Sequence, residues 1–65
     1  MKYNVILAEL RKSKGSTLRE VAQAIGVSPS TIAMYERGDR VPKDDVKVRL
    51  ATYYKRSVAS IFFAK

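Results

Sequence analysis

The chain has 65 residues, and its 13 lysines and arginines outnumber its 6 aspartates and glutamates, which gives a formal net charge of +7 at pH 7. It contains no histidine and no cysteine. This composition excludes disulfides, thiolate metal sites, the usual general base and the thiol nucleophile of enzymes. Positive charge of this density favours a polyanionic partner, and DNA is the most concentrated one available.

The sequence predicts a soluble, cytoplasmic protein without enzymatic activity. No stretch approaches the ~20 apolar residues of a membrane span, and Glu9 interrupts the apolar run near the start of the chain, which is unlike a signal peptide. The adjacent carboxylates of Asp44 and Asp45 point apart on a helix, so we expect them to stabilise its amino terminus. We therefore expect no catalytic site, no metal, no cofactor and no small-molecule ligand.

The first helix is predicted over residues 3–14. Its apolar residues Tyr3, Leu7 and Leu10 are spaced i, i+4 and i+7, which places them on one face of a helix. Gly15 follows, and glycine is typical of the position just after a last helical turn.

The most informative segment runs from Leu18 to Arg37 and consists of two helical patterns that meet at Gly26. They predict helices over residues 17–25 and 28–37. Their apolar faces consist of Val21, Ala22 and Ile25 in the first and of Ile32 and Tyr35 in the second. Glycine tolerates a positive φ in the turn, and a small alanine lets the two helices cross closely. This is the outline of a DNA-binding helix-turn-helix, and an ordinary helical hairpin is the alternative.

Both helices of this motif carry start signals. Thr17 and Glu20 form a T-x-x-E capping box, and Ser28 followed by Pro29 places an N-cap before a proline in the first helical position. These signals do not separate a DNA-binding motif from a hairpin, because they say nothing about the exposed face. The net charge of the chain favours DNA binding.

Two more helices are predicted after a loop over residues 38–43. The apolar stripe of the fourth helix consists of Val46, Leu50 and Tyr54, and Val48 lies off that stripe. The last helix is short, begins after Ser57 as its N-cap, and has an apolar face of Val58, Ile61 and Phe62.

Several residues occur at the spacing of a known family: Arg11, Val21-Ala22, Gly26-Val27-Ser28, Ile32, Tyr35-Glu36-Arg37-Gly38, Pro42 and Ile61-Phe62. With them the chain resembles the phage repressor and Cro type of helix-turn-helix regulator over nearly its whole length. The resemblance implies one all-α domain over residues 1–65, a compact five-helix lambda-repressor-like fold. It also implies binding to operator DNA, generally as a dimer, with the helix from Ser28 to Arg37 in the major groove.

The resemblance further implies a partly buried ion pair between Arg11 and Glu36, with two solvated charges as the alternative. Two departures from the family pattern matter. Leu18 stands where relatives commonly have a glutamine that binds a DNA phosphate, so we expect it to extend the apolar face instead. Lys55 and Arg56 stand where relatives often have a glycine and an apolar residue, which leaves the local turn geometry open and adds charge near a possible interface.

The positions that family members use to read bases are Ser28, Pro29, Ser30, Ala33 and Met34. None is the Arg, Gln or Asn that makes bidentate base contacts, so the target sequence is not predicted. Structural roles stay open for three of them: an N-cap for Ser28, a helix start for Pro29 and part of the core for Met34. We expect phosphate contacts from Arg37, Arg40 and Lys43, with Lys14 and Arg19 behind them.

Association of two chains is also predicted. A chain of 65 residues buries only ~60% of its unfolded surface, so a partner is an expected source of stability. Phe63 lies off the apolar stripe of the last helix and stays near solvent unless another surface covers it. The candidate dimer interface consists of Ile61, Phe62 and Phe63, and the alternative is that Phe63 packs on its own core.

The predicted function is a sequence-specific DNA-binding transcriptional regulator, a small dimeric repressor or phage-type switch protein. A protein-interaction module on the same fold, such as an antirepressor that binds another regulator, is the alternative. The net charge favours the first, because a protein-binding derivative has no need of it.

Overall fold

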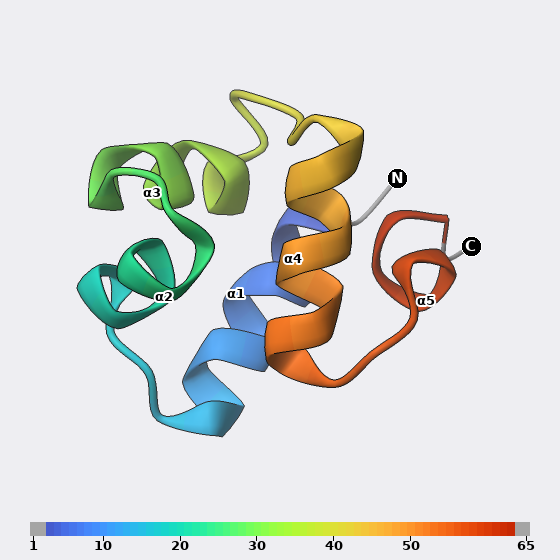
Figure 1. The fold of residues 1–65 in the computed structure, drawn as a ribbon, viewed down its shortest axis with the longest axis horizontal. Coiled ribbons are helices and arrows are strands. Elements are labelled where there is room, and N and C mark those ends of the chain that lie inside the picture. Colours follow the sequence, from blue (N-terminus) through green and yellow to red (C-terminus); the bar gives the residue numbers. More distant parts are fainter. Residues whose placement is uncertain (1–2, 64–65) are drawn as a thin grey trace.

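Five helices with short connections make up the described part of the chain, which is residues 3–63 of a computed structural model. They are α1 (Tyr3–Lys14), α2 (Leu18–Ile25), α3 (Pro29–Arg37), α4 (Asp44–Tyr54) and α5 (Val58–Phe62) (Figure 1). Helix α3 packs against both α2 and α1, while α4 joins α2 to α5. The predicted all-α fold with five helices is confirmed. Within residues 3–63 no helix is long and apolar enough to cross a membrane.

The caps of the central motif form as the sequence predicts. The Thr17 hydroxyl accepts a hydrogen bond from the Glu20 N–H at 3.1 Å, and the Glu20 carboxylate accepts one from the Thr17 N–H at 2.8 Å. The Ser28 hydroxyl accepts one from the Thr31 N–H at 3.2 Å. Gly26 ends α2 in the left-handed conformation with φ 88°. These hydrogen bonds give partners to backbone N–H groups that the start of a helix leaves unpaired.

The core lies where the five helices meet, and every helix contributes to it. The largest fully buried side chains are Leu7, Val21, Ile32, Leu50, Ile61 and Phe62. Burial of one such side chain is worth about 1.5–3 kcal/mol relative to leaving it in water. Leu18 packs against this core, as predicted from its apolar side chain. Val48, which lies off the apolar stripe of α4, is exposed.

The structure corrects the predicted dimer surface. The side chains of Ile61 and Phe62 are buried in the core of their own chain, and the Phe62 ring stacks on Tyr3 with 6.0 Å between ring centroids. They are not available to a partner while this core is intact. Phe63 is 65% exposed, so the alternative that it packs on its own core is wrong. Of the three predicted interface residues, only Phe63 offers its side chain to solvent.

Lys55 gives α4 the ending that a glycine usually gives. Its φ is 57°, in the left-handed region, and its N–H donates to the Thr52 carbonyl at 3.1 Å. The turn geometry that the sequence left open is therefore that of an ordinary helix end. A residue with a side chain pays roughly 1–2 kcal/mol to adopt this conformation, and a glycine does not.

The ion pair between Arg11 and Glu36 is present and joins α1 to α3. Arg11 Nε lies 2.8 Å from one Glu36 carboxylate oxygen and Nη2 lies 3.0 Å from the other, while Nη1 donates to the Ser16 carbonyl at 3.1 Å. The two side chains are 18% and 11% exposed, so the pair is partly buried. The hydrogen bond with Glu36 raises the pKa of Arg11, and burial acts in the opposite direction.

We predict that Glu36→Ala lowers the free energy of unfolding by about 2 kcal/mol, because it leaves the Arg11 guanidinium partly buried without its partner. The matched control is Glu9→Ala, which also removes one carboxylate from the described region but at an exposed position of α1. The control is expected to change stability by less than about 0.5 kcal/mol. Urea unfolding curves with equal slopes measure both values, and equal losses would show that the pair contributes no more than a surface charge.

Candidate nucleic-acid interface

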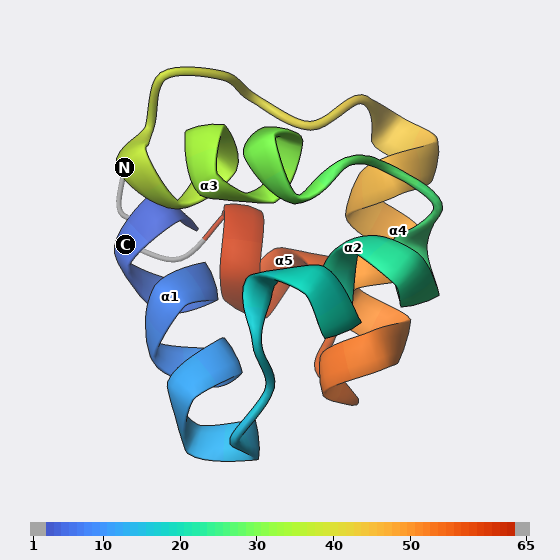
Figure 2. The same cartoon turned by 90° about the vertical axis from the view of Figure 1, so that its left-hand side faces the viewer.

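The α3 helix is fixed on one side and open on the other. Ile32 and Tyr35 are buried in the core, whereas Pro29, Ser30 and Arg37 are exposed. Figure 2 shows that α3 lies between the loop to α4 above it and α2 below it. We call six of the exposed residues of α2, α3 and this loop the motif surface: Arg19, Gln23, Pro29, Ser30, Arg40 and Lys43.

The candidate base-reading positions differ in what they can offer. The Ser28 hydroxyl caps α3 and also lies 2.9 Å from the Thr31 hydroxyl, so it serves the helix start first. Pro29 occupies the first helical position. The side chains of Ala33 and Met34 are half-buried, and Ser30 is exposed. Ser30 is thus the base-reading candidate whose hydroxyl has no structural role within residues 3–63.

The loop between α3 and α4 carries two exposed cations, Arg40 and Lys43. It is anchored from within, because the Tyr3 hydroxyl donates to the Arg40 carbonyl at 3.0 Å and Pro42 is buried. Neither cation has a carboxylate within ion-pair distance among the described residues. Arg37 differs, since its Nε lies 2.8 Å from an Asp39 carboxylate oxygen, which neutralises part of its charge.

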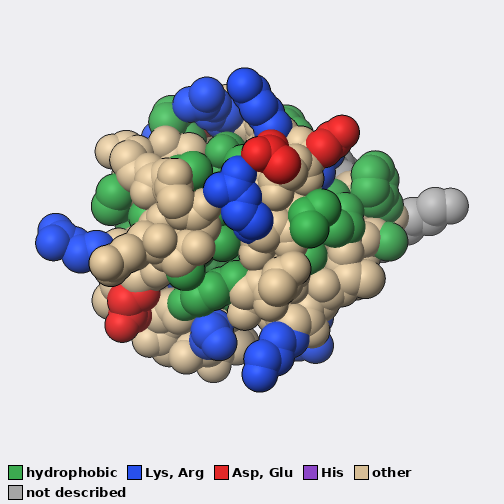
Figure 3. All heavy atoms as spheres, viewed as in Figure 1, with side chains coloured by type: hydrophobic (Ala, Val, Ile, Leu, Met, Phe, Trp, Pro, Cys, Tyr) green, Lys and Arg blue, Asp and Glu red, His purple; other side chains and the backbone are tan. Residues whose placement is uncertain are grey.

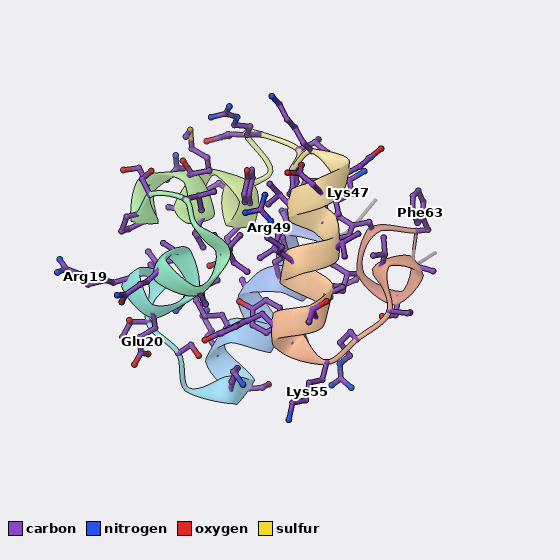
Figure 4. The ribbon with its side chains drawn as sticks, viewed as in Figure 1. Arg19, Glu20, Lys47, Arg49, Lys55 and Phe63 are labelled. Atoms are coloured by element: carbon purple, nitrogen blue, oxygen red, sulfur yellow. The ribbon has the colours of Figure 1, made fainter. Side chains whose placement is uncertain are left out.

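A hollow crosses the motif surface between α2 and α3. It is lined by Arg19, Ala22, Gln23, Val27 and Pro29. Arg19 projects away from α2 into solvent (Figure 4). Gln23 was not among the predicted site residues, although its position four residues after Arg19 places both side chains on one face of α2. A backbone phosphate that reached this hollow would meet a cation and an amide.

Lys14 lies elsewhere. It ends α1, and its Nζ is 5.0 Å from the centre of the Tyr53 ring. In both ribbon views this end of α1 is at the opposite end of the molecule from α3 (Figures 1 and 2). The structure therefore brings Arg19, Arg40 and Lys43 to the edges of the α3 face but does not bring Lys14 there.

Arg49 is a residue that sequence reasoning missed. From α4 it donates through Nη1 to the Ile25 carbonyl at 2.7 Å and through Nη2 to an Asp45 carboxylate oxygen at 2.7 Å (Figure 4). The first contact satisfies a carbonyl at the end of α2, next to the Gly26 turn. The second lowers the pKa of the Asp45 carboxyl. The Asp45–Arg49 spacing of i, i+4 was visible in the sequence, but the contact with α2 was not.

We predict that Arg49→Ala loosens the turn of the motif. The N–H groups of Gly26 and Val27 both donate to the Ala22 carbonyl, at 2.8 and 3.0 Å, and their exchange with solvent is expected to accelerate severalfold, while amides of α1 keep their rates. Asp45→Ala is the control, because it removes one partner of Arg49 and leaves the contact with Ile25. Unchanged exchange at Gly26 and Val27 in Arg49→Ala would show that Arg49 does not hold the turn.

Comparison with known proteins identifies the family. The helix-turn-helix family matches residues 7–61. A protein of Thermococcus kodakarensis that is named as an HTH-type transcriptional regulatory protein is 35% identical over 54 residues, which are 83% of this chain and 17% of that protein. The chain thus spans about a sixth of the length of this relative. No solved structure matches the chain. The chain belongs to the helix-turn-helix family.

Proposed function

We propose that this chain is a sequence-specific DNA-binding transcriptional regulator, a small dimeric repressor or phage-type switch protein, that inserts α3 into the major groove. The observation that carries the proposal is the motif surface itself. It presents an exposed helix face, with Arg19 on one side and Arg40 and Lys43 on the other, and none of these three cations is paired with a carboxylate among residues 3–63. Cations that flank a groove-sized helix are suited to the two phosphate strands beside a major groove.

Phosphate contacts would supply most of the affinity in this proposal. The anchored loop presents Arg40 and Lys43 from a fixed backbone, so little ordering is needed when they meet phosphates. Arg37 contributes less, because Asp39 already shares its charge.

Base selection would come from weaker contacts. The exposed Ser30 hydroxyl can donate or accept, and Met34 and Ala33 offer apolar surface to thymine methyl groups. No side chain on this part of α3 is an Arg, Gln or Asn, so sequence-dependent DNA shape would supply part of the specificity. The name of the Thermococcus kodakarensis relative supports a role in transcription regulation.

We predict that Arg40→Ala or Lys43→Ala weakens binding to all duplex sequences without changing the preferred one. Each lost phosphate contact is expected to reduce the slope of log K against log salt concentration by about 0.9. Fluorescence anisotropy with a random duplex at several salt concentrations measures this slope. A wild-type chain that bound random duplex with no salt dependence would contradict the proposal.

The opposite pattern is expected for Ser30→Ala and Met34→Ala. Each should change the discrimination at one or two base pairs by ~1–3 kcal/mol and leave binding to random duplex nearly intact. Selection of bound sites from random duplexes gives the preferred sequence for each variant. If both variants keep the wild-type preference, α3 is not the base-reading helix, and the alternative of a protein-interaction module becomes the leading one.

We predict a homodimer that depends on Phe63. This ring lies beside α4, with Lys47 Nζ 5.6 Å from its centre, and is 65% exposed at the edge of the molecule (Figure 4). Phe63→Ser is expected to shift the chain toward monomer in sedimentation experiments at tens of micromolar, because it removes the largest exposed apolar side chain among residues 3–63. Exposed Val5→Ser on α1 is the control. A monomer in wild type and in Phe63→Ser alike would contradict the dimer.

A further inference from the structure

A second group of cations without a carboxylate partner lies away from the motif surface. Lys14 ends α1, and Lys55 and Arg56 follow α4. Among residues 3–63 none of these three side chains has a carboxylate within ion-pair distance. Figure 3 shows Lys and Arg side chains at the bottom of the molecule as well as at the top, and Lys55 is the labelled residue at the bottom of Figure 4. We call Lys14, Lys55 and Arg56 the second basic surface.

The three cations surround a hollow between the ends of α1 and α4. Leu10, Ser13 and Tyr54 also line it, and its volume is about 230 Å³. Pockets for drug-sized ligands are usually ~300–1,000 Å³, so the hollow is too small for one but has room for a single phosphate group. Ser13 is exposed and supplies a hydroxyl group at this hollow. Cations beside hydroxyl donors are the usual protein partners of backbone phosphates.

The helix dipole does not by itself account for this surface. Cations near helix carboxyl ends interact favourably with the dipole, and this applies to Lys14 at the end of α1 and to Lys55 and Arg56 after α4. Lys55, however, occupies a left-handed position with φ 57° that glycine adopts without strain. Lys55 thus carries a charged side chain at a position where the backbone conformation favours glycine. Its neighbour Arg56 is also exposed, so the chain presents two adjacent cations to solvent at this turn.

We infer that the second basic surface binds the phosphate backbone of a second DNA segment, so that one chain can bridge two duplexes. The inference rests on the proposed function, which brings the first duplex to α3 at the opposite end of the molecule. The shortest principal extent of the fold is 20 Å, whereas the Debye length is only ~8 Å at physiological salt. Two duplexes held at opposite ends are therefore screened from each other.

The test is capture of a second duplex. A duplex is fixed to beads, the protein is bound to it, and a fluorescent random duplex is then added at several salt concentrations. Wild type is expected to retain the fluorescent duplex. The variant Lys55→Gly/Arg56→Gln is expected to retain about tenfold less at low salt, with a salt slope smaller by about 1.8 for two lost contacts. Because glycine fits the backbone at position 55, this variant is expected to fold at least as stably as wild type.

Controls separate this inference from the proposed function. Lys12→Gln removes an exposed cation from the last turn of α1 that does not line the hollow, and it should retain the second duplex within about twofold of wild type. Arg40→Ala/Lys43→Ala should instead weaken binding to the bead-bound duplex. If wild type binds the first duplex but captures no second one, the inference is overturned and the proposed function stands. If wild type binds no duplex, both are overturned.

One further arm identifies the chemistry of the partner. Poly-glutamate is added at the same charge concentration as an unlabelled competitor duplex. Stronger displacement of the fluorescent duplex by the competitor DNA supports a phosphate-backbone site. Stronger displacement by poly-glutamate would show that the surface takes an acidic polypeptide and would overturn the assignment to DNA.

Discussion

The geometry of the motif surface depends on the ion pair behind it. Arg11 holds both carboxylate oxygens of Glu36 and also the Ser16 carbonyl, so one side chain of α1 fixes the end of α3 and the chain that leads into α2. Partial burial of the two charges has a desolvation cost, and such pairs often contribute little net stability. What the pair provides is orientation. The loop with Arg40 begins after Arg37, one residue beyond Glu36, so its direction depends on how the end of α3 is held.

Local contacts explain why much of the fold could be predicted from the sequence. The capping contacts of Thr17 with Glu20 and of Ser28 with Thr31 join residues three apart, so spacing in the sequence is already proximity in space. Gly26 adopts the positive φ that its position in the pattern requires. Helix stripes of period 3.6 likewise identify the faces that lie inward. These signals depend only on spacing along the chain, so they can be recognised without knowledge of the tertiary arrangement.

The parts of the candidate site that could not be predicted are those that join distant segments. A stripe shows that Ile61 and Phe62 share an apolar face, but it does not show whether their own core or a partner covers that face, and the structure places both in the core. The basic character of a residue likewise does not show on which surface of the fold its side chain lies. Arg19 lies beside α3, whereas Lys14 lies against Tyr53. The contact of Arg49 with the Ile25 carbonyl spans 24 residues, and no spacing rule relates those two positions.

The distribution of charge carries more information than its sum. Four carboxylates form ion pairs with nearby lysines or arginines: Glu36, Asp39, Asp44 and Asp45. Glu20 accepts a backbone hydrogen bond at the start of α2. Most of the acidic side chains therefore serve the fold, and among residues 3–63 cations without a carboxylate partner lie both around α3 and at the turn after α4. A basic surface kept for solubility needs no such separation and no lysine at a left-handed helix end. Placement of this kind is expected when each end of the fold meets its own polyanion, because the field of each cluster falls off over a Debye length and acts only on the partner beside it.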